Sequence, residues 1–294
     1  VMNRLDSQYQ NLIDEVLEFG HNKPDRTGVG TKSIFDYTIT HCMCDGFPLL
    51  TTKKMAVKTM MTELKWFLRG DTNIRPLLFE NCNIWTGDAY KRYKSTYDFD
   101  LDEPLTINEF KDKIKLDYSF ATIWGELGPV YGKQWRDFNG VDQIKNLIDG
   151  LKDNPHGRRH IVNAWNVSEL SLMTLPPCHY SFQCYVDSDN KLSLKWNQRS
   201  VDTFLGLPFN IASYATLLLL LCEETGYKAG DLIGSLGDVH IYNNHIKQAT
   251  EQLNRKGFDL PKINISNVDV LGGEFDYELI DYKSEPTIKA PLNN

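Results

Sequence analysis

The half of the chain that follows Trp124 alternates strand patterns with long helical patterns, and this alternation restricts the possible folds more than any other feature. Alternating apolar residues predict strands at 161–165, 180–186, 192–196 and 234–242. Apolar residues at three- and four-residue spacing predict helices at 141–151 and 211–225. Several strands that share a core with a few long helices are typical of the α+β class.

The remaining segments complete this pattern. Further helices are predicted near 5–17, 57–68, 107–116 and 244–253, and further strand-like segments near 33–40, 262–266 and 275–283. Residues 86–120 are polar and rich in Lys and Asp. We interpret this segment as an insertion rather than a linker, because the apolar segments on its two sides look incomplete without each other.

Composition excludes some classes of function. The chain has 32 basic and 39 acidic residues, a net charge of -7, which argues against a general binder of nucleic acid. The longest apolar run, 215–222, is far shorter than the roughly 20 residues of a membrane span, and the first ten residues have no signal-peptide core. We therefore expect no membrane association and a cytoplasmic location. Cysteines this sparse indicate a reducing compartment, and five are interpreted as small hydrophobic residues: Cys42, Cys44, Cys82, Cys184 and Cys222.

Cys178 differs from the other cysteines. It follows two prolines, which stiffen the chain, and it stands at the entrance of a predicted strand beside His179. A thiol fixed in this way can act as a nucleophile if positive groups lower its pKa. From this fragment alone, a structural role for Cys178 is favoured over a catalytic one.

Four arginines could supply such positive groups or bind an anion. Arg158 and Arg159 lie in a turn before a predicted strand, Arg199 follows another strand, and Arg26 lies in the loop DRTGVG. Taken singly, each is more readily interpreted as a solvated cation or an ion-pair partner. The glycines of that loop, Gly28 and Gly30, are interpreted as a turn because no Lys-Ser or Lys-Thr pair follows them.

Three other positions invite a chemical interpretation. Glu63 lies within the apolar helix MMTELKWFL, where a carboxylate must find partners or have a raised pKa. Asn210 precedes a predicted helix and is interpreted first as its N-cap. His240 and His245 are five residues apart with no carboxylate at ligand spacing, so we expect no metal site.

Nine segments, taken in order, resemble the thymidylate synthase family across nearly the whole chain. They are DRTGVGT, FPLLTTKKM, ELKWFLRGDTNI, LGPVYGKQWRDF, GRRHIVNAWN, LPPCHYSFQCYV, QRSVDTFLGLPFNIASY, GDVHIYNNH and PTIKAP. The resemblance implies one α+β catalytic domain over 1–294, in which several long helices pack on a mixed sheet. It also implies an obligate homodimer through a face of that sheet, and a variable insertion at about 86–123.

The resemblance further implies reductive methylation of dUMP to dTMP, with 5,10-methylenetetrahydrofolate giving carbon and hydride and leaving as dihydrofolate. Cys178 would add to carbon 6 of uracil, and Asn210 would bind the uracil edge. Glu63, Tyr131 and His179 would manage the protons. The residues expected to bind the nucleotide are Arg26, Arg199, Ser200, Asp202, His240 and Tyr242, with Arg158 and Arg159 donated by the neighbouring subunit.

For the folate, the resemblance implies a pocket lined by Lys53, Trp85, Leu175, Asp202, Gly206 and Phe209. The chain departs from the family pattern on this side. It reads TGDAY after Trp85, where many members carry an acidic residue and a second aromatic. Asn197 stands where tyrosine is common, and Asn293 and Asn294 stand where the family has an apolar residue that closes over the folate.

Two alternatives follow from these departures. One is a dUMP hydroxymethylase, in which water captures the one-carbon unit and the folate is not oxidised. The other is a nucleotide- or RNA-binding relative without catalysis, which the presence of Cys178, Arg199, Asn210 and Glu63 argues against. Trp85, Leu175 and the segment IKAP favour the synthase.

Overall fold

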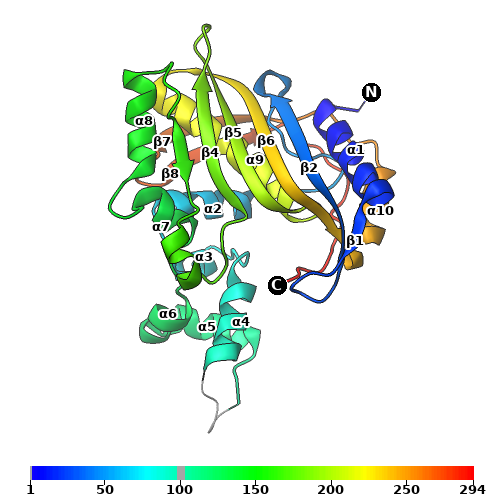
Figure 1. The fold of residues 1–294 in the computed structure, drawn as a ribbon, viewed down its shortest axis with the longest axis vertical. Coiled ribbons are helices and arrows are strands. Elements are labelled where there is room, and N and C mark those ends of the chain that lie inside the picture. The colour runs from blue at the N-terminus through cyan, green and yellow to red at the C-terminus, as the bar shows by residue number, and fades with distance from the viewer. Residues whose placement is uncertain (1, 98–102) are drawn as a thin grey trace.

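A six-stranded mixed sheet forms the centre of the computed structural model, which describes residues 2–97 and 103–294. The strand order is β1-β2-β6-β5-β4-β3; β5 and β6 run parallel and the other neighbouring pairs antiparallel (Figure 1). The strands are β1 (His21–Lys23), β2 (Thr31–Cys42), β3 (Ile161–Asn163), β4 (His179–Val186), β5 (Lys191–Asp202) and β6 (Lys228–Tyr242). A separate hairpin pairs β7 (Lys262–Asp269) with β8 (Glu274–Ile280). The α+β prediction is confirmed.

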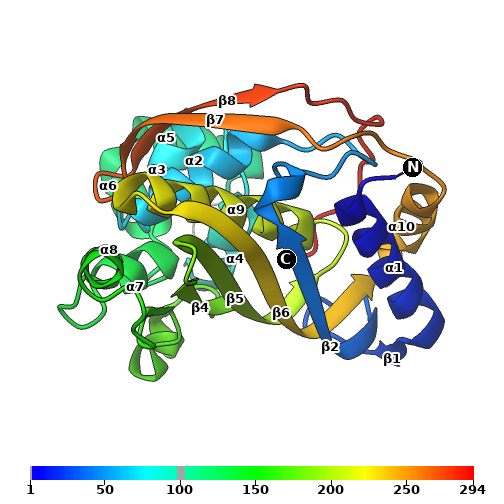
Figure 2. The same cartoon turned by 90° about the horizontal axis from the view of Figure 1, so that it is seen from above.

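The α-helices gather around this sheet. They are α1 (Arg4–Phe19), α2 (Val57–Leu68), α3 (Arg75–Phe79), α4 (Thr86–Thr96), α5 (Ile107–Leu116), α6 (Tyr118–Trp124), α7 (Tyr131–Arg136), α8 (Gln143–Asp153), α9 (Gly206–Thr225) and α10 (Ile246–Leu253). Short 3-10 helices are η1 (Met43–Asp45), η2 (Val167–Leu172) and η3 (Asn243–His245). Figure 2 shows α2 and α9 on one side of the sheet. α9 makes the crossover that lets β5 and β6 run parallel.

The two faces of the sheet differ in burial. The register partners Val162, Phe182 and Trp196 are fully buried toward the helices. In the adjacent row, which points to the other face, Ile161 pairs with Gln183 and Gln183 with Lys195, and all three side chains are exposed. Because side chains alternate along a strand, one face of the sheet belongs to the core and the other carries an exposed apolar residue beside polar ones.

α9 is the core helix of the molecule. Its 20 residues are long and apolar enough to cross a membrane by length and composition, unlike the shorter run seen in the sequence. However, 67% of its most apolar window is buried inside the protein, as in the core helix of a soluble protein. Asn210 lies inside this helix, so its interpretation as an N-cap is wrong. The helix begins at Gly206, and the Asp202 carboxylate accepts from the Leu205 N–H at 3.3 Å in the turn directly before it.

The predicted insertion contains more helix than the sequence suggests. Only the helix at 107–116 was predicted there, yet α4 and α6 are also present. Aromatic rings hold the three together: Phe110 lies 5.3 Å from Tyr90 and 5.9 Å from Phe120 between ring centroids. Part of the predicted insertion, residues 98–102, lies outside the described residues.

Cys42 and Cys44 form a disulfide in the structure, so their interpretation as small hydrophobic residues is wrong. β2 ends at Cys42 and η1 turns the chain at once, which brings the two Cα atoms to 5.2 Å and leaves Cys44 exposed. The other four cysteines are free, and Cys82, Cys184 and Cys222 are buried as expected.

A buried carboxylate positions the segment that leads into the site. Asp6, on α1, accepts from the backbone N–H groups of Thr51 and Thr52, each at 3.1 Å. It also accepts from both threonine hydroxyls, at 2.6 and 2.8 Å. Gln252, on α10, donates to the Thr52 hydroxyl at 2.8 Å. These bonds fix the chain directly before Lys53.

Candidate active site

Cys178 lies directly before β4 and is held from two sides. Its backbone N–H donates to the Tyr131 hydroxyl at 2.8 Å. The Arg199 guanidinium donates to the carbonyls of Pro176 and Pro177, at 3.1 and 2.8 Å. The Arg199 N–H donates to the Cys178 carbonyl at 2.9 Å. The thiol itself is half-buried, so this turn presents it while its backbone stays fixed.

Opposing charges surround the thiol. Burial raises the pKa of Cys178, and the positive charges of Arg199 and Arg26 oppose that rise. The carboxylates of Asp88 and Asp202 raise the pKa further. The ligand-free site therefore favours a thiol rather than a thiolate, with two cations close enough to stabilise the thiolate.

Glu63 is buried against aromatic rings, as its place in an apolar helix predicts. Its Oε2 accepts from the Trp85 indole Nε1–H at 2.9 Å. The Trp85 ring lies 6.1 Å from that of Trp66 and 6.0 Å from that of Tyr131. Burial raises the pKa of Glu63 to about 7, although the bond from Trp85 opposes this. Near neutral pH the carboxyl can both give and accept a proton.

His179 stands on the inner side of the thiol. Its ring stacks on Tyr131 at 4.2 Å, and its Nδ1 lies 2.5 Å from the Tyr214 hydroxyl. Burial lowers the pKa of His179 to about 3 and raises that of Tyr131 well above its ordinary value. At neutral pH both groups are uncharged, so they can relay or orient protons without adding charge to the site.

Asn210 reaches the site through a chain of amides. The Trp196 indole N–H donates to Gln198 Oε1 at 3.0 Å. Gln198 Nε2 then donates to Asn210 Oδ1 at 3.2 Å and to the Ser200 carbonyl at 3.0 Å. Since the indole can only donate, this chain fixes which side of the Asn210 amide carries the oxygen.

His240 and Tyr242 lie near the end of β6. His240 Nδ1 lies 3.2 Å from Asp238 Oδ1, and the His240 and Tyr242 rings are 5.3 Å apart. Asp238 also binds Lys23 at 2.8 Å and the Ser33 hydroxyl at 2.5 Å. These contacts hold the pKa of Asp238 well below its usual range, the bond to His240 most of all. Burial raises the pKa of Tyr242 to about 12.

Lys53 carries a buried amine close to Asp202. Its Nζ donates to the Phe204 carbonyl at 2.5 Å and lies 3.7 Å from the Phe204 ring centroid. Burial lowers the pKa of Lys53 to about 7, and Asp202 opposes this. Of the other predicted folate residues, Leu175 and Phe209 pack half-buried against the core, and Gly206 lies where a Cβ would contact the Asp202 side chain at 3.4 Å.

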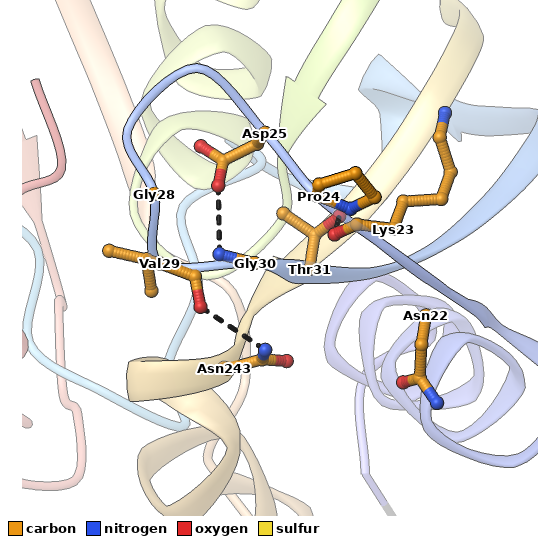
Figure 3. A pocket seen from close by; sticks show the side chains of 9 residues that line it. All are labelled: Asn22, Lys23, Pro24, Asp25, Gly28, Val29, Gly30, Thr31 and Asn243. Atoms are coloured by element: carbon orange, nitrogen blue, oxygen red, sulfur yellow. Dashed lines mark hydrogen bonds between the residues drawn. The ribbon is translucent and has the colours of Figure 1, made fainter.

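Arg26 is presented by an ordered loop. The loop borders a cavity of about 370 Å³. The Asp25 carboxylate accepts from the Gly30 N–H at 2.8 Å, and Asn243 donates to the Val29 carbonyl at 3.2 Å (Figure 3). Gly28 and Gly30 both have positive φ, which confirms the predicted turn. Arg26 itself is exposed, and its charge acts on both Cys178 and Asp88.

The structure does not bring Arg158 and Arg159 to the thiol. Both are exposed and line a cavity of about 800 Å³ beside α8 and β3, together with Asn146 and His156. The two arginines that act on the charge of Cys178 are Arg199 and Arg26. If Arg158 and Arg159 contact an active site, it must therefore be one other than the Cys178 pocket of their own chain.

Sequence reasoning missed four residues of the site: Gln198, Tyr214, Asp88 and Asp238. Gln198 and Asp238 each stand one or two residues from a predicted site residue, which is a usable signal. Asp88 and Tyr214 reach the site only because α4 and α9 pack beside it, and no local sequence pattern predicts that packing. Among residues 2–97 and 103–294, no group of three or more His, Cys, Asp or Glu could hold a metal ion.

The mixed sheet and the aromatic pocket beside Cys178 define an α+β enzyme. The sequence model of the family described as thymidylate synthase matches residues 7–294, and the chain belongs to this family. The thymidylate synthase of Mycoplasma mobile is 50% identical over 289 residues, 97% of this chain and 99% of that protein. Those of Phytoplasma mali and Mesoplasma florum are 47% and 46% identical, over 96% and 97% of this chain and 98% and 99% of their own lengths.

The pKa of Glu63 predicts a pH dependence of stability. Its ordinary value is 4.5 and its folded value about 7, so the folded protein binds more protons between these pH values. The free energy of unfolding should therefore decrease as pH rises from about 4.5 to 7, by on the order of 3 kcal/mol from this group. Urea unfolding of wild type and Glu63→Gln at pH 5 and pH 8 isolates the effect.

Other titrating groups, such as His179, are present in both proteins. Their contributions to the change in the free energy of unfolding therefore cancel in this comparison. Wild type should lose more stability than Glu63→Gln between pH 5 and pH 8. An equal change in the two proteins would show that Glu63 titrates normally.

Proposed function

We propose that this protein converts dUMP and 5,10-methylenetetrahydrofolate to dTMP and dihydrofolate. The observation that carries the proposal is the geometry of Cys178, whose backbone is fixed by Tyr131 and Arg199 on the same side as the buried Glu63. A positioned thiol, a nearby cation and a carboxyl that titrates near neutral pH are what an addition to a uracil ring requires. The hydroxymethylase alternative is not favoured, because the relatives are named thymidylate synthases.

The thiol begins the proposed reaction. Cys178 gives its proton to solvent, and the thiolate adds to carbon 6 of dUMP. The electron pair of the carbon 5–carbon 6 double bond then moves toward carbon 5 and O4, so that carbon 5 becomes nucleophilic. Arg199 and Arg26 stabilise the thiolate. In the same site these arginines, with Ser200, bind the 5'-phosphate, because guanidinium groups suit phosphate oxygens.

Protons move on the aromatic side of the pocket. Glu63 exchanges a proton with the uracil O4 side through ordered water, and its pKa of about 7 suits both directions. Tyr131 and His179, stacked at 4.2 Å, keep bulk water from this side, so that only ordered water takes part in the proton transfer. Water exclusion strengthens each of these interactions.

Asn210 selects the base. Gln198 fixes the position of the Asn210 side-chain oxygen. The Asn210 amide then accepts a hydrogen bond from the uracil N3–H and donates one to O4. Cytosine has an acceptor at N3 and a donor at the neighbouring exocyclic position, so it does not match. His240 and Tyr242 bind the 3'-hydroxyl of the sugar, and Asp238 orients the His240 ring. The side chain of Asp202 lies between the nucleotide and the folate residues.

The folate residues fit a flat, partly apolar ring system. Trp85 is buried and forms one wall, while Leu175 and Phe209 are half-buried and form apolar contacts. Lys53 and Asp202 supply the polar groups at the edge. When bound, the folate provides the one-carbon unit and the hydride, and these residues hold it and keep water away.

We also infer a homodimer in the cytoplasm, a reducing compartment in which the Cys42–Cys44 disulfide would be opened. The exposed row of Ile161, Gln183 and Lys195 marks the sheet face that a second copy would cover. Arg158 and Arg159, placed outside their own thiol pocket, would then reach the phosphate site of the partner. Residues 86–123 would be a variable insertion within the single domain 1–294.

Replacing the proposed nucleophile tests the function. Cys178→Ser should lower turnover of dUMP to below about one thousandth of wild type, because loss of a nucleophile usually costs more than that. Binding of dUMP should remain measurable, since the arginine and amide contacts do not use sulfur. Cys184→Ser, a buried cysteine further along β4, is the matched control. Substantial dTMP formation by Cys178→Ser would contradict the proposal.

Subunit mixing tests the donated arginines. Cys178→Ser dimers and Arg158→Ala/Arg159→Ala dimers should each be inactive. After exchange, every hybrid has one site with its own thiol and an intact arginine pair, so about a quarter of wild-type activity should return. If verified hybrids recover none, the arginines act within their own chain.

A further inference from the structure

A disulfide joins Cys42 and Cys44 at the turn where β2 ends, outside the residues assigned to dUMP and the folate. One residue, Met43, separates the two cysteines, and their Cα atoms are 5.2 Å apart. Cys44 is exposed and Cys42 is half-buried. A small molecule can therefore reach the sulfur of Cys44 more readily than that of Cys42.

Hydrogen bonds on the β2 side of the pair fix this turn without using sulfur. β2 stays paired with β6 as far as Cys42, which lies opposite Asp231. The buried His41 ring reaches across the turn, and its Nε2 lies 2.8 Å from the Gly46 carbonyl. A ring nitrogen that faces a carbonyl must carry the proton, so His41 is the donor and ties the two ends of the turn together.

The far end of the turn packs against residues 260–261. The Phe47 N–H donates to the Pro261 carbonyl at 2.9 Å. A Cβ at Gly46 would be 3.0 Å from Leu260 Cβ, and the φ of Gly46 is 114°, a conformation that favours glycine. Because none of these contacts involves sulfur, the turn keeps the two thiols beside each other when the disulfide is opened.

Opening this disulfide costs the protein little stability. A disulfide stabilises a fold mainly by restricting the unfolded chain, and the restriction grows with the number of residues enclosed. With one residue enclosed, this contribution is small. Exposed disulfides are also the ones that small thiols reduce most readily. An exposed pair on a turn that other contacts hold can therefore open and close repeatedly.

We propose that Cys42 and Cys44 form a reversible redox site, entered at Cys44, whose reaction partners are a low-molecular-weight thiol and the corresponding disulfide. The site uses none of the residues proposed to bind dUMP or the folate, so the inference goes beyond the proposed function. In a reducing compartment the pair is a dithiol, and an excess of the small disulfide closes it.

Each direction of the reaction consists of two thiol–disulfide exchanges. In reduction, a small thiolate attacks the Cys44 sulfur, the bond between the two cysteines breaks, and Cys42 leaves as a thiolate that takes up a proton. A second small thiolate then attacks the sulfur of the first, which releases a small disulfide and leaves Cys44 to take up a proton. The protein gains two electrons and two protons, and two small thiols are oxidised to one disulfide.

The first test measures the redox equilibrium of the ligand-free wild-type protein. The protein is equilibrated without oxygen in mixtures of reduced and oxidised glutathione, quenched with acid, denatured and alkylated. Trypsin cuts after Lys32 and Lys53, so one peptide carries both cysteines, and mass spectrometry counts its alkyl groups. The peptide should change from two alkyl groups to none as the mixture becomes more oxidised. Cys222, which is buried, should remain a thiol throughout.

Two results of this test would overturn the proposal. A peptide without alkyl groups in fully reduced glutathione would show a structural disulfide. A peptide that keeps two alkyl groups in fully oxidised glutathione would show two independent thiols. Neither measurement depends on turnover of dUMP, so failure of the proposed function would not affect the test.

Single variants test the point of entry. With oxidised glutathione, Cys42→Ser should form a mixed disulfide at Cys44 several-fold faster than Cys44→Ser forms one at Cys42, because only Cys44 is exposed. Equal rates, or a faster reaction at Cys42, would refute entry at Cys44.

The variant His41→Phe tests the role of the turn, because it removes the bond to Gly46 and keeps a buried ring. The ratio of oxidised to reduced glutathione at which half of the pair is closed should rise several-fold, since the thiols are held together less well. His160→Phe is the matched control, because the buried His160 ring likewise bonds a backbone carbonyl, that of Asn154 at 2.9 Å. Thermal melting of both variants separates a shift from general unfolding. An unchanged ratio in folded His41→Phe would contradict the role of the turn.

Discussion

Exclusion of water from one side of the Cys178 pocket is the constraint on which the site depends. α2 brings Glu63 into contact with the Trp85 indole, and the rings of Tyr131 and His179 stack beside it. In such surroundings each ionisable group prefers its uncharged form. Burial accordingly raises the pKa of Glu63 and of Cys178 and lowers that of His179.

The charges of the site are gathered on its other side. Arg26 and Arg199 act on the charge of Cys178 from a loop and from β5, and so does the carboxylate of Asp202. The thiol therefore lies at the boundary between an uncharged wall and a charged one. This division suits a reaction in which an anionic nucleotide is bound on one side while a folate ring and a hydride are kept from water on the other.

Much of this could be predicted from local sequence, for identifiable reasons. The two prolines before Cys178 and the carboxylate inside an apolar helix are signals that physical chemistry can interpret alone. The N-cap role is wrong for Asn210, because the apolar residues before it look like a loop although the helix already begins at Gly206. Tyr214 was missed because its partner, His179, is 35 residues away and is brought close only by packing.

Two helices of the insertion, α4 and α6, likewise could not be predicted from local sequence. α6 is short and α4 is polar along most of its length, and their aromatic residues find partners only when three helices meet, so neither segment has a strong apolar period. The disulfide between Cys42 and Cys44 depends likewise on the turn that η1 makes after β2. Local patterns predicted the sheet and the long helices well, since those elements are long enough to repeat.

The most direct measurement of the central claim is a titration of Cys178 itself. The pH dependence of alkylation by iodoacetamide, measured on ligand-free protein with Cys178→Ser as the blank, reports the thiolate at this position. Burial should place its midpoint above the ordinary value of 9.0, and Arg199→Ala should move it higher still because one opposing cation is gone. A midpoint below 9.0 in wild type, or one that Arg199→Ala leaves unchanged, would contradict the account of a desolvated thiol balanced by arginine.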